Sequence, residues 1–218
     1  MAFTLTNQGS NNGYGSSLTI ASFTPTANSL LILTSYRRNN TAPNAPTGHG
    51  TWTLVDSVSG NNRQVYTYAL LIGASPSADT VSVSWANSST GTITVTQVQG
   101  SDLTDITTAI PQSNALNFYN GGGGSHVNTL PLTAFGSATN LTMVMCQDSG
   151  TTTPEAGYSI DFDDEVNVYF LAAEDTTPSF NTTQNFTNVK GISLEVQEAG
   201  GASPFNAFWA TDSNELIY

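Results

Sequence analysis

The sequence predicts an all-β protein made of two tandem antiparallel β-sandwiches of jelly-roll or immunoglobulin-like type. Three observations favour this fold class. Only 9% of the residues are charged, and Thr and Ser cover sheet surfaces, whereas helix surfaces usually carry Lys, Glu and Arg. Apolar and polar residues alternate with a period of two in many segments. The second part of the chain also repeats the order of segments found in the first.

The expected strands are alternating segments that lie between turn clusters rich in Gly, Pro and Asn. Two runs, 29–34 and 141–146, are apolar on both faces, so we expect them to be central strands that are packed on both sides. No segment keeps a 3.6-residue period over three turns, and no long helix is expected. The clearest alternating segments, in chain order, are 18–23, 65–70, 80–85, 92–96 and 191–196.

A faint internal repeat relates the two parts of the chain and indicates an internal duplication. Residues 2–34 superpose on 114–146 without a gap at an offset of 112, which places Leu31 on Met143. Later pairs of segments follow in the same order at an offset of about 101. The shorter offset places the missing residues in loops, where deletions are tolerated.

The repeat predicts a first sandwich over 1–108, a second over 109–202 and a terminal segment over 203–218. A single larger sandwich or barrel, in which each half supplies one sheet, is the alternative. The terminal segment is an apolar, aromatic tail, which we interpret as an arm that docks on a neighbouring subunit; a closing strand of the second sandwich is the alternative. Its predicted contact residues are Phe205, Phe208, Trp209, Leu216, Ile217 and Tyr218.

The charge is strongly negative and unevenly distributed. The net charge of −12 comes from 16 acidic and four basic residues, and only one of the basic residues lies after position 110. Such a surface repels phosphates and anionic headgroups, so neither nucleic acid nor a membrane is an expected partner. Arg37 and Arg38 follow the apolar run 29–34, and we predict that they bind the acidic second half of the same or an adjacent subunit. A strand end held in solvent is the alternative.

Residues suited to catalysis are sparse. His49 and His126 lie in Gly-rich contexts without a nucleophile, phosphate-binding or Cys-x-x-Cys motif. The acidic run Asp161-Phe-Asp-Asp-Glu165 is predicted to be a solvated hairpin tip, with calcium ligation or a glycosidase carboxylate pair as alternatives. Cys146 lies in an apolar run and is predicted to be a core residue. We therefore expect no enzyme, no cofactor and no bound metal.

Four segments share one strand rhythm: Ser17-Leu-Thr-Ile20, residues 23–33, Thr51-Trp-Thr-Leu-Val55 and Val65-Tyr-Thr-Tyr-Ala69. This rhythm resembles that of bacteriophage structural proteins of β-sandwich type, which include capsid decoration or cement proteins and tail-fibre or baseplate modules. The resemblance covers both halves. It implies a virion component, commonly a homotrimer, that is bound to the major capsid protein or other virion subunits by β-surface contacts and terminal arms. It transfers no catalytic residue.

The expected function is that of a capsid decoration or cement protein, which stabilises a phage shell by bridging its subunits. A tail-fibre or baseplate receptor-binding module and a carbohydrate-binding domain are the alternatives. Both would bind a glycan receptor through aromatic side chains near loops. The N-terminal sequence lacks the features of a signal peptide, so we expect a protein made in the host cytoplasm and built into the virion. The candidate aromatic residues are Tyr14, Tyr36, Trp52 and Tyr119.

Overall fold

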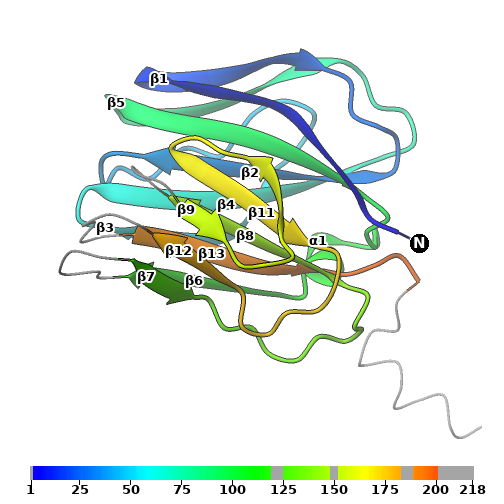
Figure 1. Ribbon diagram of the computed structural model, residues 1–218. Helices are drawn as coiled ribbons and strands as arrows, with labels where there is room; N and C mark the ends of the chain where they lie inside the picture. The colour runs from blue at the N-terminus through cyan, green and yellow to red at the C-terminus, as the bar shows by residue number, and fades with distance from the viewer. Residues whose placement is uncertain (1, 119–124, 148–151, 183–188, 201–218) are drawn as a thin grey trace, which may run out of the picture.

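The computed structural model describes residues 2–118, 125–147, 152–182 and 189–200, which form an all-β fold (Figure 1). This confirms that the fold is all-β, whereas the two tandem sandwiches of jelly-roll or immunoglobulin-like type stay a prediction. In the described residues, no helix is long and apolar enough to cross a membrane. The first half contains β1 (Thr4–Phe23), β2 (Ser29–Arg37), β3 (Thr53–Gly60), β4 (Arg63–Ile72) and β5 (Asp79–Gln99). A short helix, α1 (Ile106–Ala109), precedes β6 (Gln112–Phe118), β7 (His126–Thr129), β8 (Leu141–Gln147), β9 (Thr152–Pro154), β10 (Ser159–Phe162), β11 (Val166–Leu171), β12 (Ser179–Thr182) and β13 (Val189–Val196).

Within the described residues, the strands form three antiparallel sheets. The first sheet has the order β1-β5-β2-β4-β3, the second β10-β11-β8-β13-β6, and the third β7-β12-β9. The first and second sheets lie face to face, so that β3 meets β6 at one edge and β1 meets β10 at the other. Figure 1 shows the third sheet on the outer side of the second. Each half therefore supplies one large sheet to the middle of the molecule.

The long strands β1 and β5 also build an outer layer on the first sheet. Their pairing has a register shift between Gly15 and Ser17, and such a bulge bends a strand pair. Beyond it, the end of β1 pairs with the beginning of β5, and this ribbon lies over the first sheet (Figure 1). The first half thus has an outer layer as the second half does.

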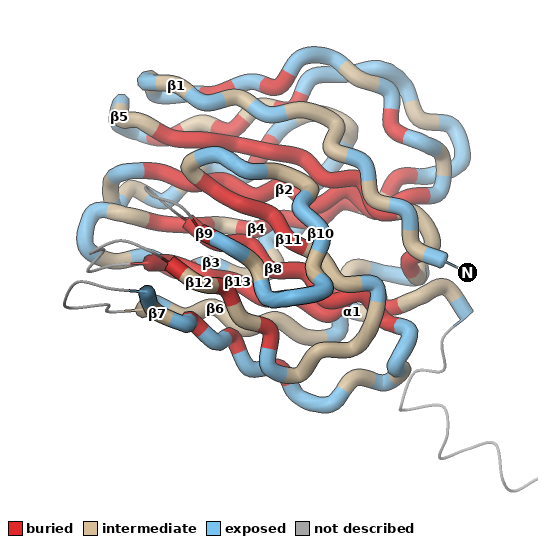
Figure 2. Tube along the Cα trace, in the orientation of Figure 1, coloured by how far each residue is buried: buried red, intermediate tan, exposed pale blue. Residues whose placement is uncertain are grey.

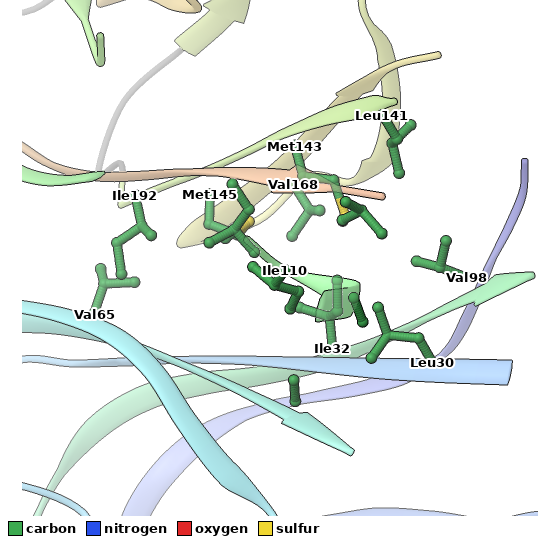
Figure 3. Packing of buried hydrophobic residues seen from close by; sticks show 14 of the residues in the cluster. Leu30, Ile32, Val65, Val98, Ile110, Leu141, Met143, Met145, Val168 and Ile192 are labelled. Atoms are coloured by element: carbon green, nitrogen blue, oxygen red, sulfur yellow. The ribbon is translucent and has the colours of Figure 1, made fainter. Parts of the chain in front are cut away.

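In the part of the chain that the structure describes, apolar side chains fill three separate cores. The inner core lies between the two large sheets and contains Ile32 and Met143 (Figure 3). The first outer core lies under the β1–β5 ribbon and contains Trp85, and the second outer core lies under the third sheet and contains Phe180. Figure 2 shows that burial is concentrated in the middle strands of the stack. The structure therefore combines a core for each half with one large sandwich that both halves share.

The central strands β2 and β8 are buried along their whole length. On β2, Leu30 and Ile32 contribute to the inner core, whereas Leu31 and Leu33 contribute to the first outer core. Each strand is third of five in its sheet, so both predicted central strands are confirmed. Cys146 on β8 is a buried core residue, as predicted.

The two large sheets have the same strand order when β1, β5, β2, β4 and β3 are matched with β6, β13, β8, β11 and β10. The edge strands β3 and β10 also agree in detail. Leu54 pairs with Tyr68, Ile160 pairs with Tyr169, and a register shift follows each pair. Leu54 is 49% exposed and Ile160 55% exposed. The two halves therefore present aliphatic side chains at matching positions on opposite edges of the stack.

The gapless superposition at an offset of 112 is wrong for the central strands. It places Leu31 on Met143, but Leu31 lies in the first outer core and Met143 in the inner core. The ladders instead match Leu33 with Val144, because these residues pair with the two matched tyrosines. A shift of one residue turns every side chain of a strand to the opposite face of its sheet. Only the register of the ladders aligns residues that face the outer core in both halves.

The connector between the halves is packed into the fold. Asp105 caps α1, and its carboxylate accepts a hydrogen bond from the Thr108 backbone N–H at 2.7 Å. Ala109 and Ile110 are buried in the inner core. The predicted boundary between residues 108 and 109 thus falls inside a helix that contacts this core, and the division into domains stays a prediction.

The beginning of β1 and the end of β13 approach each other beside Gly100. The Ala199 N–H donates to the Gly100 carbonyl at 2.7 Å. A Cβ atom placed on Gly100, whose φ is +88°, would lie 3.0 Å from the carbonyl oxygen of Ala2. Glycine is therefore needed here for its positive φ and for the close approach of a neighbouring backbone.

Candidate functional site

The acidic hairpin between β10 and β11 lies against the first half of the chain. We call this contact the acidic seam, and it consists of three hydrogen-bonded pairs, of which one is also an ion pair. The prediction of a solvated tip holds for Asp163 and Asp164, which are exposed, but not for Asp161, which is partly buried inside β10. The pairs are Asp161 with Thr96, Asp164 with Asn12 and Glu165 with Arg38.

Asp161 occupies the register shift of β10. Its carboxylate accepts a hydrogen bond from the Thr96 hydroxyl at 2.5 Å. Burial raises the pKa of this carboxyl group, and hydrogen bonds from Thr96 and Asn7 offset part of the increase. At the matching shift of β3 the chain has Val55, which packs against the inner core. The second half thus places a carboxyl group where the first half has an apolar side chain.

We expect Asp161→Asn to reduce the pH dependence of stability. Because the pKa of Asp161 in the folded protein lies above the ordinary 3.8, its stabilising contribution is complete below that value and is lost as the pH rises through the raised pKa. Urea unfolding at a series of acidic pH values measures this. As the pH rises through this range, the variant should lose less stability than the wild type. Asp163→Asn, in the exposed part of the hairpin, is the control; an identical profile for wild type and Asp161→Asn would contradict the assignment.

Arg38 forms an ion pair with the second half of the chain. Its Nη2 lies 2.7 Å from Oε1 of Glu165, and the Arg38 side chain is 47% exposed. The expected contact between this arginine and the acidic half is therefore made within the chain. An exposed pair of this kind contributes about 0–1 kcal/mol to stability, so it orients the hairpin more than it holds the fold together. Binding of Arg38 to another subunit stays a prediction.

Arg37 is buried inside the first half, and the alternative of a strand end in solvent is wrong for it. Its side chain points away from the acidic hairpin and lies 4.1 Å from the centre of the Trp85 ring. Its Nη2 donates to the carbonyl oxygens of Gly15 and Asn87. Burial lowers the pKa of this guanidinium. Arg37 therefore fastens the bend of the β1–β5 ribbon, and its predicted role in binding another subunit stays a prediction.

A second polar cluster lies at the other edge of the inner core. Lys190 on β13 is fully buried, and its Nζ donates to Oδ1 of Asn117 on β6 at 2.6 Å. Burial lowers the pKa of Lys190 to about 8, and the positive charge of Arg63 on β4 lowers it further. Sequence reasoning missed this pair, although strand alternation places Lys190 on the same face as Ile192.

The two histidines lie in different halves. His49 has a φ of +59°, its backbone N–H donates to Asp79 at 3.0 Å, and its ring packs on Phe23 with centroids 4.5 Å apart. It borders a small cavity of about 170 Å³ between β4 and β5, which Ser75 also lines. Burial lowers the pKa of His49, which favours the neutral imidazole. His126 begins β7 in the other half.

The remaining predicted residues differ in exposure, and some of them lie outside the described residues. Tyr36 and Trp52 are buried, whereas Tyr14 is 78% exposed at the bend of β1. Tyr119 lies outside the described residues, as do the six predicted contact residues of the terminal segment: Phe205, Phe208, Trp209, Leu216, Ile217 and Tyr218. Within the part of the chain that the structure describes, no group of three His, Cys, Asp or Glu side chains is placed to hold a metal ion.

The fold and these contacts define a class of all-β proteins with stacked sheets, in which an apolar inner core joins the two halves and the acidic seam lies at one edge of that core. Comparison with models of known protein families gave no match, and no curated protein matches the chain.

Proposed function

We propose that this protein is a bacteriophage virion component, a capsid decoration or cement protein that stabilises the shell by bridging its subunits. The matching exposed side chains of Leu54 and Ile160 carry the proposal. They lie on the edge strands β3 and β10, at opposite edges of the stack. A shell presents the same surface many times, and a protein with two like contact points can join two neighbouring copies.

The proposal includes an origin of the two halves by internal duplication of a small sandwich of jelly-roll or immunoglobulin-like type. Their identical strand order and matched register shifts support this. The contacts between the two stacked large sheets also support the duplication. Since β3 corresponds to β10 and β6 to β1, the contact of β3 with β6 is the counterpart of the contact of β10 with β1. Such reciprocal contacts are the pattern of a twofold dimer interface.

The distribution of charge supports a basic partner surface, for which the major capsid protein is our proposal. Arg37 and Lys190 are buried, and Arg38 is paired with Glu165. Because 16 acidic residues outnumber the four basic ones in the sequence, a partner that complements the acidic surface carries Lys or Arg around its apolar contact. Assembly as a homotrimer and docking through residues 203–218 belong to the same proposal.

Purified particles of the phage that encodes the chain provide the test. Quantitative mass spectrometry should find the protein in numbers comparable to the shell subunits, whereas a tail component would be present in few copies. Leu54→Asp and Ile160→Asp should each weaken binding to stripped particles, and the double variant should abolish it. Val127→Asp, at a 68% exposed position of β7, is the control. Particles without the protein, or a double variant that binds like the wild type, would overturn the proposal.

A glycan-binding role, as in a tail-fibre or baseplate module or a carbohydrate-binding domain, is the second candidate. It is favoured by Tyr14, a residue that is 78% exposed at the bend of β1 and whose aromatic ring can stack on a sugar. A glycan array that compares the wild type with Tyr14→Ala tests this candidate. Selective binding by the wild type that the variant lacks would favour it over the cement role.

A further inference from the structure

Lys190 lies at a position where strand β13 otherwise has apolar side chains. Ile192, Leu194 and Val196 follow it at alternate positions and all belong to the inner core. Lys190 is 0% exposed. A buried ammonium group is costly unless a carboxylate compensates its charge, and among the described residues no carboxylate forms an ion pair with it.

The polar partner of Lys190 is a neutral amide. Its Nζ donates to Oδ1 of Asn117 at 2.6 Å, and the two residues are directly opposite each other in the β6–β13 ladder. The ladder therefore holds the amine and the amide in contact, which replaces an encounter in solution by a fixed geometry. Asn117 itself is exposed at the sheet edge, so its Nδ2 group can reach water.

The electrostatic surroundings favour a nucleophilic amine. Burial and the charge of Arg63 lower the pKa of Lys190 to about 8, so a substantial fraction of the side chain is neutral in mildly alkaline solution. The neutral amine, not the ammonium ion, attacks a carbonyl carbon. The positive charge of Arg63 also favours negative charge that develops on the neighbouring amide oxygen.

We propose that Lys190 and Asn117 join in an intramolecular isopeptide bond. The lone pair of Nζ attacks Cγ of Asn117, the Nζ–Cγ bond forms, and the Cγ–Nδ2 bond breaks. One Nζ proton is transferred, through water at the exposed edge, to the departing nitrogen, which leaves as ammonia. No atom is oxidised or reduced, and no further reactant is needed.

The bond would fasten the edge strand β6 to β13 covalently. A cross-link between distant residues removes conformational freedom from the unfolded chain, and one at a sheet edge also prevents the edge strand from peeling away. The bond does not depend on the proposed virion function. Its presence or absence is decided on the purified protein alone.

Mass spectrometry of the full-length chain after incubation in mildly alkaline buffer tests the proposal. The intact mass should be lower than that of the sequence by one ammonia. A cyclic imide at an Asn-Gly step also releases ammonia, so the decisive observation is a branched peptide that contains both Lys190 and Asn117 after proteolysis. The absence of this peptide from the wild type would overturn the proposal.

Variants separate the bond from other losses of ammonia. Lys190→Arg and Asn117→Ala should both lack the branched peptide. Asn114→Ala, on the same strand, should keep it, since Asn114 instead donates to the Pro131 carbonyl. A branched peptide that persists in Asn117→Ala would assign the bond to another residue and refute this one.

Discussion

Ile32→Ala is expected to lower the free energy of unfolding by about 2–5 kcal/mol, the usual cost of truncating a fully buried aliphatic side chain. Ile32 is 1% exposed on the central strand β2 and faces the inner core. Figure 3 shows it beside Ile110 and Leu30, with side chains of the second half across the gap. Because this core belongs to both halves, the variant should still unfold in one transition, shifted as a whole.

Chemical denaturation followed by circular dichroism and by tryptophan fluorescence measures this effect. The two probes should agree, since the described tryptophans Trp52 and Trp85 lie in the first half, whereas the sheet signal comes from both halves. Val127→Ala, at an exposed aliphatic position, should change stability by less than about 0.5 kcal/mol. Two separate transitions, only one of which moves in Ile32→Ala, would mean that the halves unfold independently.

Arg37→Met should cost about 2–4 kcal/mol, on the scale of hydrogen bonds to a charged group and of polar groups left unpaired. The substitution keeps an unbranched side chain of similar length. It removes the donors to the carbonyl oxygens of Gly15 and Asn87 and the cation above the Trp85 ring. The bend of the β1–β5 ribbon then loses its fastening, and near-ultraviolet circular dichroism of Trp85 should change with it.

Arg38→Met is the matched control for this experiment. It removes the neighbouring guanidinium, whose only described ion pair is the half-exposed contact with Glu165, and should cost less than about 1 kcal/mol. Salt should reduce this smaller effect, because exposed charges are screened, and should leave the Arg37→Met effect nearly unchanged. Equal losses in the two variants would contradict the assigned difference between the two arginines.

Strand alternation was sufficient to predict the β class, the two central strands and the burial of Cys146. It was not sufficient to set the register between the halves, because bulges insert single residues and side-chain direction reverses with each one. Leu31 and Met143 illustrate the result, since they align in the sequence and yet face different cores. The outer layer formed by the far ends of β1 and β5 also depends on a bulge that composition does not reveal.

The burial of some polar residues could be predicted from the sequence, and the burial of others could not. The burial of Lys190 could be predicted from strand alternation, because Lys190 lies on the same face of β13 as the core residue Ile192. The burial of Asp161 was not, since it occupies a register shift where alternation fails. The burial of Arg37 was not predicted, because its environment is made by Trp85, a residue far along the chain. Contacts of this kind follow from topology, which local pattern does not determine.

The meeting of Ala2 and Ala199 at Gly100 determines how the molecule can be attached to its surroundings. Ala2 and Ala199 therefore lie together at one corner of the stack. A cargo or tether fused next to either residue would therefore project from the same corner. The protein is suited to be anchored at one point while the edges that carry Leu54 and Ile160 remain open to neighbours.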